Sequence, residues 1–164
     1  DIIFDFINIE EQNKMVKSKI TKINSDIKEL KIGEAEESLN ELGKMKSLKS
    51  YEKDYLEIKG KLKSAKLRLF DIDRSIKFEI EKVKENIKKS EASKVGYVEK
   101  NKNLTKLYKE SVDYLEKIIL SHPYTTYRYD VNILQSDIYA KLGMPNSAKN
   151  AMEEAKKYEG RRKE

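Results

Sequence analysis

Apolar residues recur at steps of three and four along most of the chain, which is the spacing of one face of an α-helix. The first such stretch covers residues 10–31, and a shorter one covers residues 31–44. Gly33 is expected to separate these two helices, and Gly43 stands where a helix usually ends. The pattern therefore predicts an all-α fold built from antiparallel helical hairpins.

The longest apolar pattern begins at Tyr51 and repeats every seven residues, with further apolar residues between the repeats, as in a coiled-coil seam. The seam consists of Tyr55, Ile58, Leu62, Ala65, Leu69, Ile72, Ile76 and Val83. Residues 70–75 contain two Asp and one Ser and are a candidate position for a kink or break. We expect a long heptad-patterned arm that packs on its own neighbours, with self-association through the arm as the alternative.

Residues 88–97 combine small polar residues with a Gly and form the best candidate boundary in the chain. We therefore divide it into N-terminal helical hairpins with the long arm, residues 1–90, and a C-terminal helical domain, residues 91–164. A helix resumes by Asn103 and is expected to stop near Pro123, because proline cannot continue a helix.

A helical hairpin is predicted at the C-terminal end, with helices at about 129–143 and 145–158. Gly143 terminates the first helix, and Pro145 suits the first turn of the second because its missing N–H is not needed there. The second helix carries a face of small residues that lets two helices approach closely. These residues are Ala148, Ala151 and Ala155.

This hairpin resembles a tetratricopeptide repeat (TPR), a helix-turn-helix unit of about 34 residues. The matching positions are Ser136, Tyr139, residues 141–143, Ala148, Met152 and Ala155. The departures are Asn132 in place of a large aromatic residue, Gln135 in place of Leu, and Gly160 in place of the closing Pro. The resemblance covers residues 129–158 and extends in part to 103–158.

The TPR resemblance implies a protein-interaction module, since stacked hairpins form a groove that receives a partner. Carried onto this chain, the residues implied to face that groove are Asp130, Ile133, Asp137, Ala140 and Lys141. We therefore expect a non-enzymatic scaffold that binds another protein through a helical groove or through the arm.

Charge supplies the alternative, a basic helical module that binds nucleic acid or an anionic membrane surface. The net charge is +6, but only five of the 35 basic residues are Arg, the side chain best suited to phosphate and guanine contacts. Most Lys alternate with Glu or Asp, as in residues 82–89, which is typical of a solvated helix face with i,i+4 ion pairs. Specific nucleic-acid binding is therefore not expected.

Residues that carry common catalytic chemistry are scarce. The chain has no Cys and one His, His122, so Cys-based nucleophiles, disulfides and Cys metal sites are excluded. No Gly-rich phosphate loop and no cluster of His and carboxylate residues occurs in the sequence. We expect no enzymatic activity, no cofactor and no metal.

The compartment is addressed only by composition and by the first residues. No run approaches the roughly 18 apolar residues of a membrane span. Residues 1–9 are mainly apolar, interrupted by Asp1 and Asp5, and we expect Ile3, Phe6 and Ile7 to dock on the chain's own helices. A removed leader or lipid anchor before Asp1 is the alternative. The bias toward Lys, Ile and Asn resembles envelope lipoproteins of Borrelia-type spirochaetes, which implies the bacterial cell envelope; otherwise the chain is expected in the cytoplasm.

Overall fold

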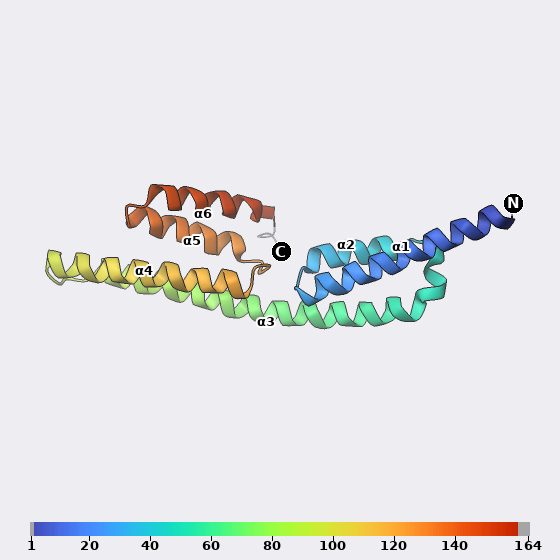
Figure 1. Cartoon of the computed structure of the whole chain (residues 1–164). Helices are drawn as coiled ribbons and strands as arrows, with labels where there is room; N and C mark the ends of the chain where they lie inside the picture. Colours follow the sequence, from blue (N-terminus) through green and yellow to red (C-terminus); the bar gives the residue numbers. More distant parts are fainter. Residues whose placement is uncertain (1, 161–164) are drawn as a thin grey trace. The chain divides into compact units, whose positions relative to one another are not determined.

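The computed structural model describes the backbone of residues 2–160 and the side chains of residues 9–45 and 48–160. Within that part of the chain, the fold is all-α, with six α-helices and one short 3-10 helix (Figure 1). The elements are α1 (Ile2–Lys28), α2 (Ile32–Gly43), η1 (Lys46–Tyr51), α3 (Glu52–Glu91), α4 (Tyr97–Ser121), α5 (Arg128–Lys141) and α6 (Pro145–Lys157). The predicted all-α fold is confirmed.

The chain forms two compact units, residues 1–70 and 71–164. We call them the N-unit and the C-unit. Helix α3 is continuous through residues 70 and 71 and contributes to the core of each unit. The predicted boundary at residues 88–97 contains the turn between α3 and α4, whereas the division into compact units falls inside α3.

The turn between α1 and α2 differs from the prediction. Gly33 lies inside α2, and the reversal is made at Leu30, whose φ of 61° is left-handed. The backbone N–H of Lys31 donates to the carbonyl oxygen of Asp26 at 2.8 Å, which closes the end of α1. A left-handed leucine is strained by its Cβ, so packing rather than local preference selects this turn.

Antiparallel neighbours build the N-unit. Lys19 Nζ donates to Glu41 Oε2 at 2.6 Å between α1 and α2, and Lys66 forms an ion pair with Glu36 between α3 and α2. The core joins all three helices through buried apolar side chains. These are Val16, Ile23, Ile27, Ala35, Leu39, Leu42, Ile58, Leu62 and Ala65.

Two further expectations concern the ends of N-unit helices. Gly43 is the last residue of α2, as predicted, and a Cβ at this position would meet the hydroxyl of Tyr55 at 3.0 Å. Helix α1 begins at Ile2 rather than near residue 10. The side chains of Ile3, Phe6 and Ile7 lie outside the described residues, so their docking stays a prediction.

Helix α3 is a single helix of 40 residues with no break at residues 70–75. Asp73 is buried on this helix and holds the loop between α4 and α5. Its Oδ1 accepts from Thr125 Oγ1 at 2.5 Å, and its Oδ2 accepts from Thr126 Oγ1 at 2.7 Å. The polar residue that suggested a kink is therefore satisfied by a distant loop, and the helix continues.

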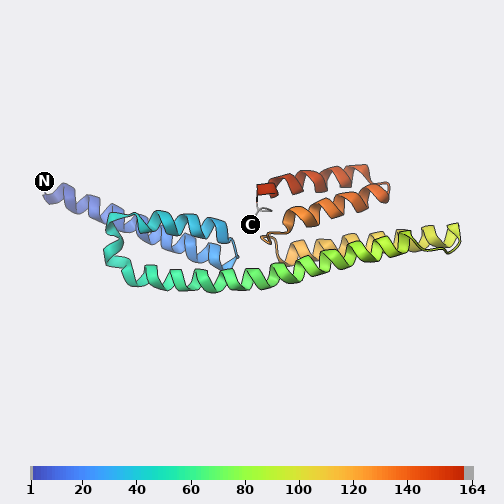
Figure 2. The same ribbon diagram turned by 180° about the vertical axis from the view of Figure 1, so that it is seen from behind.

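Helices α3 and α4 of the C-unit form an antiparallel pair, visible in Figure 2. Tyr108 donates to Glu91 at 2.9 Å and Tyr114 donates to Glu79 at 2.6 Å, so residues rise along α4 as they fall along α3. Helix α5 completes the core. The buried members are Ile76, Ile80, Val83, Ile87, Tyr108, Val112, Leu115, Ile118, Ile119, Val131, Leu134 and Ile138.

The predicted hairpin at the C-terminal end is confirmed as the pair α5 and α6. Gly143 adopts a φ of 73°, which a residue with a Cβ rarely accepts, and Pro145 occupies the first turn of α6. Ser136 Oγ donates to the carbonyl oxygen of Ala148 at 2.8 Å, and Ala155 is fully buried. Small side chains thus allow the two helices to approach closely.

Candidate functional site

The outward face of α3 in the N-unit carries large apolar side chains that the seam does not use. Leu56, Leu67 and Phe70 are exposed by 59%, 64% and 64%. Together with Gly60 and Lys63 they follow one another at steps of three and four, so they share one side of the helix. We call these five residues the outer stripe.

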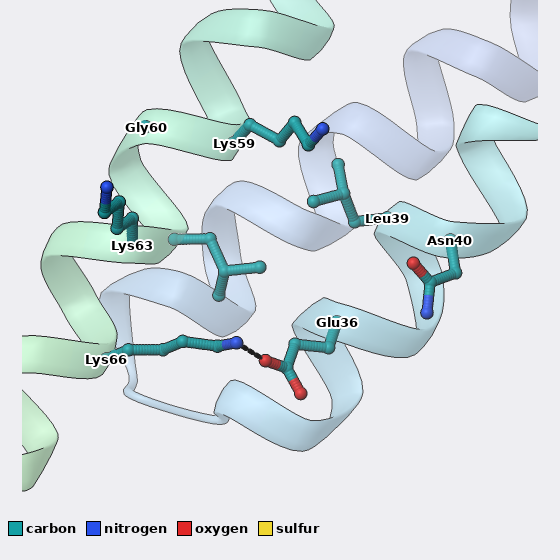
Figure 3. Close-up of a pocket in the computed structure, with 8 residues that line it drawn as sticks. Glu36, Leu39, Asn40, Lys59, Gly60, Lys63 and Lys66 are labelled. Carbon is teal, nitrogen blue, oxygen red and sulfur yellow. Dashed lines mark ion pairs between the residues drawn. The ribbon is translucent and has the colours of Figure 1, made fainter.

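Beside the outer stripe lies an open groove between α2 and α3, with a volume of about 630 Å³ (Figure 3). Its apolar lining comes from Leu39 and Leu62, whose side chains continue into the N-unit core. Gly60 and Lys63 belong both to the groove and to the outer stripe. The groove therefore joins an apolar floor to an exposed apolar row.

The charges around this α2–α3 groove are mainly positive. Lys59, Lys63 and Lys66 line it from α3, whereas Glu36 is its one carboxylate. Lys66 pairs with Glu36, and Lys59 Nζ lies 5.6 Å from the centre of the Tyr55 ring. The ion pair is exposed on both sides, and such surface pairs stabilise a fold little. A ligand carboxylate can therefore compete for Lys66.

The five residues implied by the TPR resemblance all lie on α5, on the side away from most of the C-unit core. Three are exposed and two are half-buried. These are, in that order, Asp137, Ala140 and Lys141, then Asp130 and Ile133. Helix α5 thus holds them on one side, but none of them lines the α2–α3 groove.

Lys141 has contacts with the neighbouring helices. Its Nζ donates to Glu91 Oε1 at 2.6 Å and lies 5.8 Å from the centre of the Tyr108 ring. The hydrogen bond from Lys141 holds the pKa of Glu91 below its usual value. Burial, and then the hydrogen bond to Glu91, raise the pKa of Tyr108 to about 12. Lys141 therefore helps to fasten the end of α5 to α3 and α4.

A second cavity, of about 370 Å³, lies among α4, α5 and α6 and has polar walls. Arg128 Nε donates to Asn132 Oδ1 at 2.9 Å, and Asn132 Nδ2 donates to Gln135 Oε1 at 3.1 Å. Gln135 Nε2 then donates to Glu116 Oε2 at 3.0 Å. Because of this chain of bonds, Asn132 and Gln135, two of the three departures from the TPR pattern, are buried with their hydrogen bonds satisfied.

Sequence reasoning missed both cavities. A signal for the α2–α3 groove was present, because Leu56, Leu67 and Phe70 are apolar but fall outside the heptad seam. The polar cavity gave no comparable signal. Its hydrogen bonds lie within α5 and between α5 and α4, and the second kind depends on how the two helices pack.

The remaining chemistry is limited. Among the side chains that the structure describes, those of residues 9–45 and 48–160, no group of three or more His, Cys, Asp or Glu is arranged to hold a metal ion. In the same part of the chain, no helix combines the length and the apolar character needed to cross a bilayer. The exposed pair Lys89–Glu85, at 3.1 Å, is of the i,i+4 kind expected from the alternating charges of residues 82–89.

Comparisons of the chain with models of protein families, with curated proteins and with solved structures find no match.

Proposed function

We propose that the chain is a non-enzymatic scaffold that binds a partner protein through its helical surface. The observation that carries this proposal is the outer stripe, because α3 exposes Leu56, Leu67 and Phe70 in addition to the face that it buries. Scattered exposed apolar residues are ordinary. A row on one helix side next to an open groove is instead typical of a protein-binding surface.

We further propose that α5 and α6 are a TPR-like unit that contributes to binding. The bond from Ser136 to Ala148 and the burial of Ala155 support it, because a small residue at these positions is what close TPR helices need. In this proposal the partner also contacts α5. The residues involved are Asp130, Ile133, Asp137, Ala140 and Lys141.

The outer side of α6 is polar. Lys149, Glu153 and Lys156 are exposed there. Within this unit we therefore assign partner binding to α5.

Site-specific cross-linking tests the scaffold proposal. A photo-reactive phenylalanine analogue replaces Leu67 in one sample and the exposed Lys117 of α4 in a control, and each is irradiated in lysate of the organism that produces the chain. We expect a discrete cross-linked protein from position 67 that excess unlabelled wild type displaces and that the variant Leu67→Asp does not. Equal cross-linking from both positions, or none from position 67, contradicts the proposal.

A further inference from the structure

We infer that the α2–α3 groove binds one acidic amphipathic helix of a partner protein. This inference rests on the proposed scaffold function and adds the site and the chemistry of the partner. Three features carry it, namely the apolar floor, the open backbone at Gly60 and the row of lysines.

The apolar features fit a helix. Leu39 and Leu62 line the groove, and Leu67 and Phe70 stand exposed at the next turns of α3. An amphipathic helix presents apolar side chains at the same three- and four-residue steps. It can therefore place one side chain over the floor and the next ones against Leu67 and Phe70, as helices do when they bind in grooves.

Gly60 gives the partner backbone room to approach. It lies in the interior of α3, where glycine is unfavourable relative to alanine, and no atom lies within 4 Å of the position that its Cβ would take. The groove is thus open at Gly60 because a side chain is missing. Close approach of another backbone is a recurring use of glycine.

The charges select an acidic partner. The groove is lined by three lysines and by one carboxylate, that of Glu36; the lysines are Lys59, Lys63 and Lys66. Glutamates that flank the apolar stripe of the partner would therefore meet positive charge. A second copy of α3 would bring the same lysines against these and is disfavoured by repulsion. Nucleic acid would match the charge but not the exposed Leu67 and Phe70.

Two designed peptides provide the probe. Both are fluorescein-labelled helices of about 20 residues, long enough to follow roughly 30 Å of α3, with leucines in one stripe. One has glutamates on the flanks and the other has lysines. Fluorescence anisotropy with the full chain should show dissociation constants at least about tenfold lower for the glutamate peptide. Added salt should weaken its binding.

Two variants locate the site. Gly60→Leu fills the groove, and we expect about tenfold weaker binding of the glutamate peptide with a melting temperature equal to or above that of wild type. Lys63→Glu should weaken it to a similar extent, whereas Lys82→Glu, an exposed position on α3 in the C-unit, should not. Circular dichroism confirms that each variant keeps its helices.

Each alternative result overturns the inference. Equal binding of the two peptides removes the charge argument, and unchanged binding by a folded Gly60→Leu variant removes the groove. Tighter binding of a DNA duplex than of the glutamate peptide points to nucleic acid. A dimer of wild type that Gly60→Leu dissociates, measured by sedimentation, points to a second copy. If the peptide fails but Leu67 still cross-links a partner, the scaffold function stands and this inference falls.

Discussion

The two units bury polar side chains in different ways. Among the described residues, the N-unit has an apolar core with two buried polar residues, Asp26 and Ser38, and Asp26 Oδ2 has no hydrogen-bond partner. The described part of the C-unit buries six polar residues, and hydrogen bonds given above engage five of them. The six are Asp73, Ser111, Thr125, Asn132, Gln135 and Ser136. Among the described residues, side-chain hydrogen bonds thus hold most buried polar groups of the C-unit, whereas one buried carboxylate oxygen of the N-unit has no such partner.

The two units therefore reach the same fold class by two means. Apolar packing holds α1, α2 and the first part of α3 together, and it tolerates many related arrangements. Each buried polar group of the C-unit needs one particular partner, because an unsatisfied buried group is destabilising. The bonds to Asp73 and between Ser136 and Ala148 thus define the register of the C-unit helices.

The largest expected effect is the loss of the Asp73 carboxylate. Asp73→Ala removes the acceptor of Thr125, which is 1% exposed, and of Thr126, so we expect the free energy of unfolding to fall by about 3 kcal/mol. Urea denaturation measures it. Asp71→Ala, at an exposed position two residues away, should change stability by less than about 0.5 kcal/mol. A loss below about 1 kcal/mol for Asp73→Ala would contradict the importance of this bond.

The next effect tests the close approach of α5 and α6. Ala155 is fully buried and Ala148 is half-buried, so Ala155→Leu should destabilise the chain by about 2 kcal/mol through overpacking, with a smaller loss for Ala148→Leu. Lys149→Leu on the exposed side is the control and should stay within about 0.5 kcal/mol. Urea melts compare the three, and a neutral Ala155→Leu would mean that the helices have room between them.

A smaller effect of opposite sign is expected at Asp26 in the N-unit. Asp26→Leu removes a buried carboxylate oxygen that has no hydrogen-bond partner, and a polar group buried without such a partner is destabilising. We expect the free energy of unfolding to rise by about 1 kcal/mol. Lys22→Leu, an exposed change on the same helix, controls for added apolar surface. If Asp26→Leu destabilises as Asp73→Ala does, the contrast between the units is lost.

The smallest effect is a pH dependence at Glu91. Since Lys141 lowers its pKa in the folded chain, Glu91 stabilises the fold above its ordinary pKa of 4.5 and loses this contribution as pH falls through the lowered pKa. The raised pKa of Tyr108 has the opposite sense, with stability lost as pH rises from 10 toward about 12. Urea melts should therefore show that the difference in the free energy of unfolding between wild type and Glu91→Gln becomes smaller below pH 4.5 and above pH 10.

Glu41 gives the matched comparison for Glu91. Lys19 lowers its pKa as well, but Glu41 is the more exposed of the two carboxylates, at 53% against 38%. Solvent screens an exposed pair more strongly, so Glu41→Gln should show a smaller pH-dependent difference. If the pH-dependent change in the free energy of unfolding is larger for Glu41→Gln than for Glu91→Gln, exposure does not decide the strength of these two ion pairs.

Features with a local cause could be predicted from the sequence. The turn at Gly143 and Pro145 depends on the backbone freedom of glycine and on the missing N–H of proline, which neighbouring residues cannot change. The all-α fold and the end of α4 before Pro123 have similarly local causes. The heptad seam also predicted the buried side of α3, because periodicity reports which positions share a face.

Features with a distant cause could not be predicted. Asp73 suggested a kink because its hydrogen-bond partner, Thr125, is 52 residues away and is not evident from the neighbouring sequence. Gly33 suggested a turn, but packing places that turn at Leu30. The α2–α3 groove depends on how α2 lies against α3, so no spacing within α3 alone reveals it. The partner-binding assignment on α5 came from a resemblance and stays a prediction.

The Asp73 bond also has a kinetic consequence. Most helix pairs of the described chain, such as α1–α2, α4–α5 and α5–α6, are neighbours in sequence, and contacts between near neighbours form quickly. The hydrogen bonds that Asp73 accepts from Thr125 and Thr126 instead close a segment of more than 50 residues. Closing a longer segment costs more chain entropy, so these bonds should form more slowly. We expect them to form after the rate-limiting step of folding, so that they stabilise the folded state without stabilising the transition state. Asp73→Ala should then speed unfolding in stopped-flow experiments and leave the refolding rate almost unchanged.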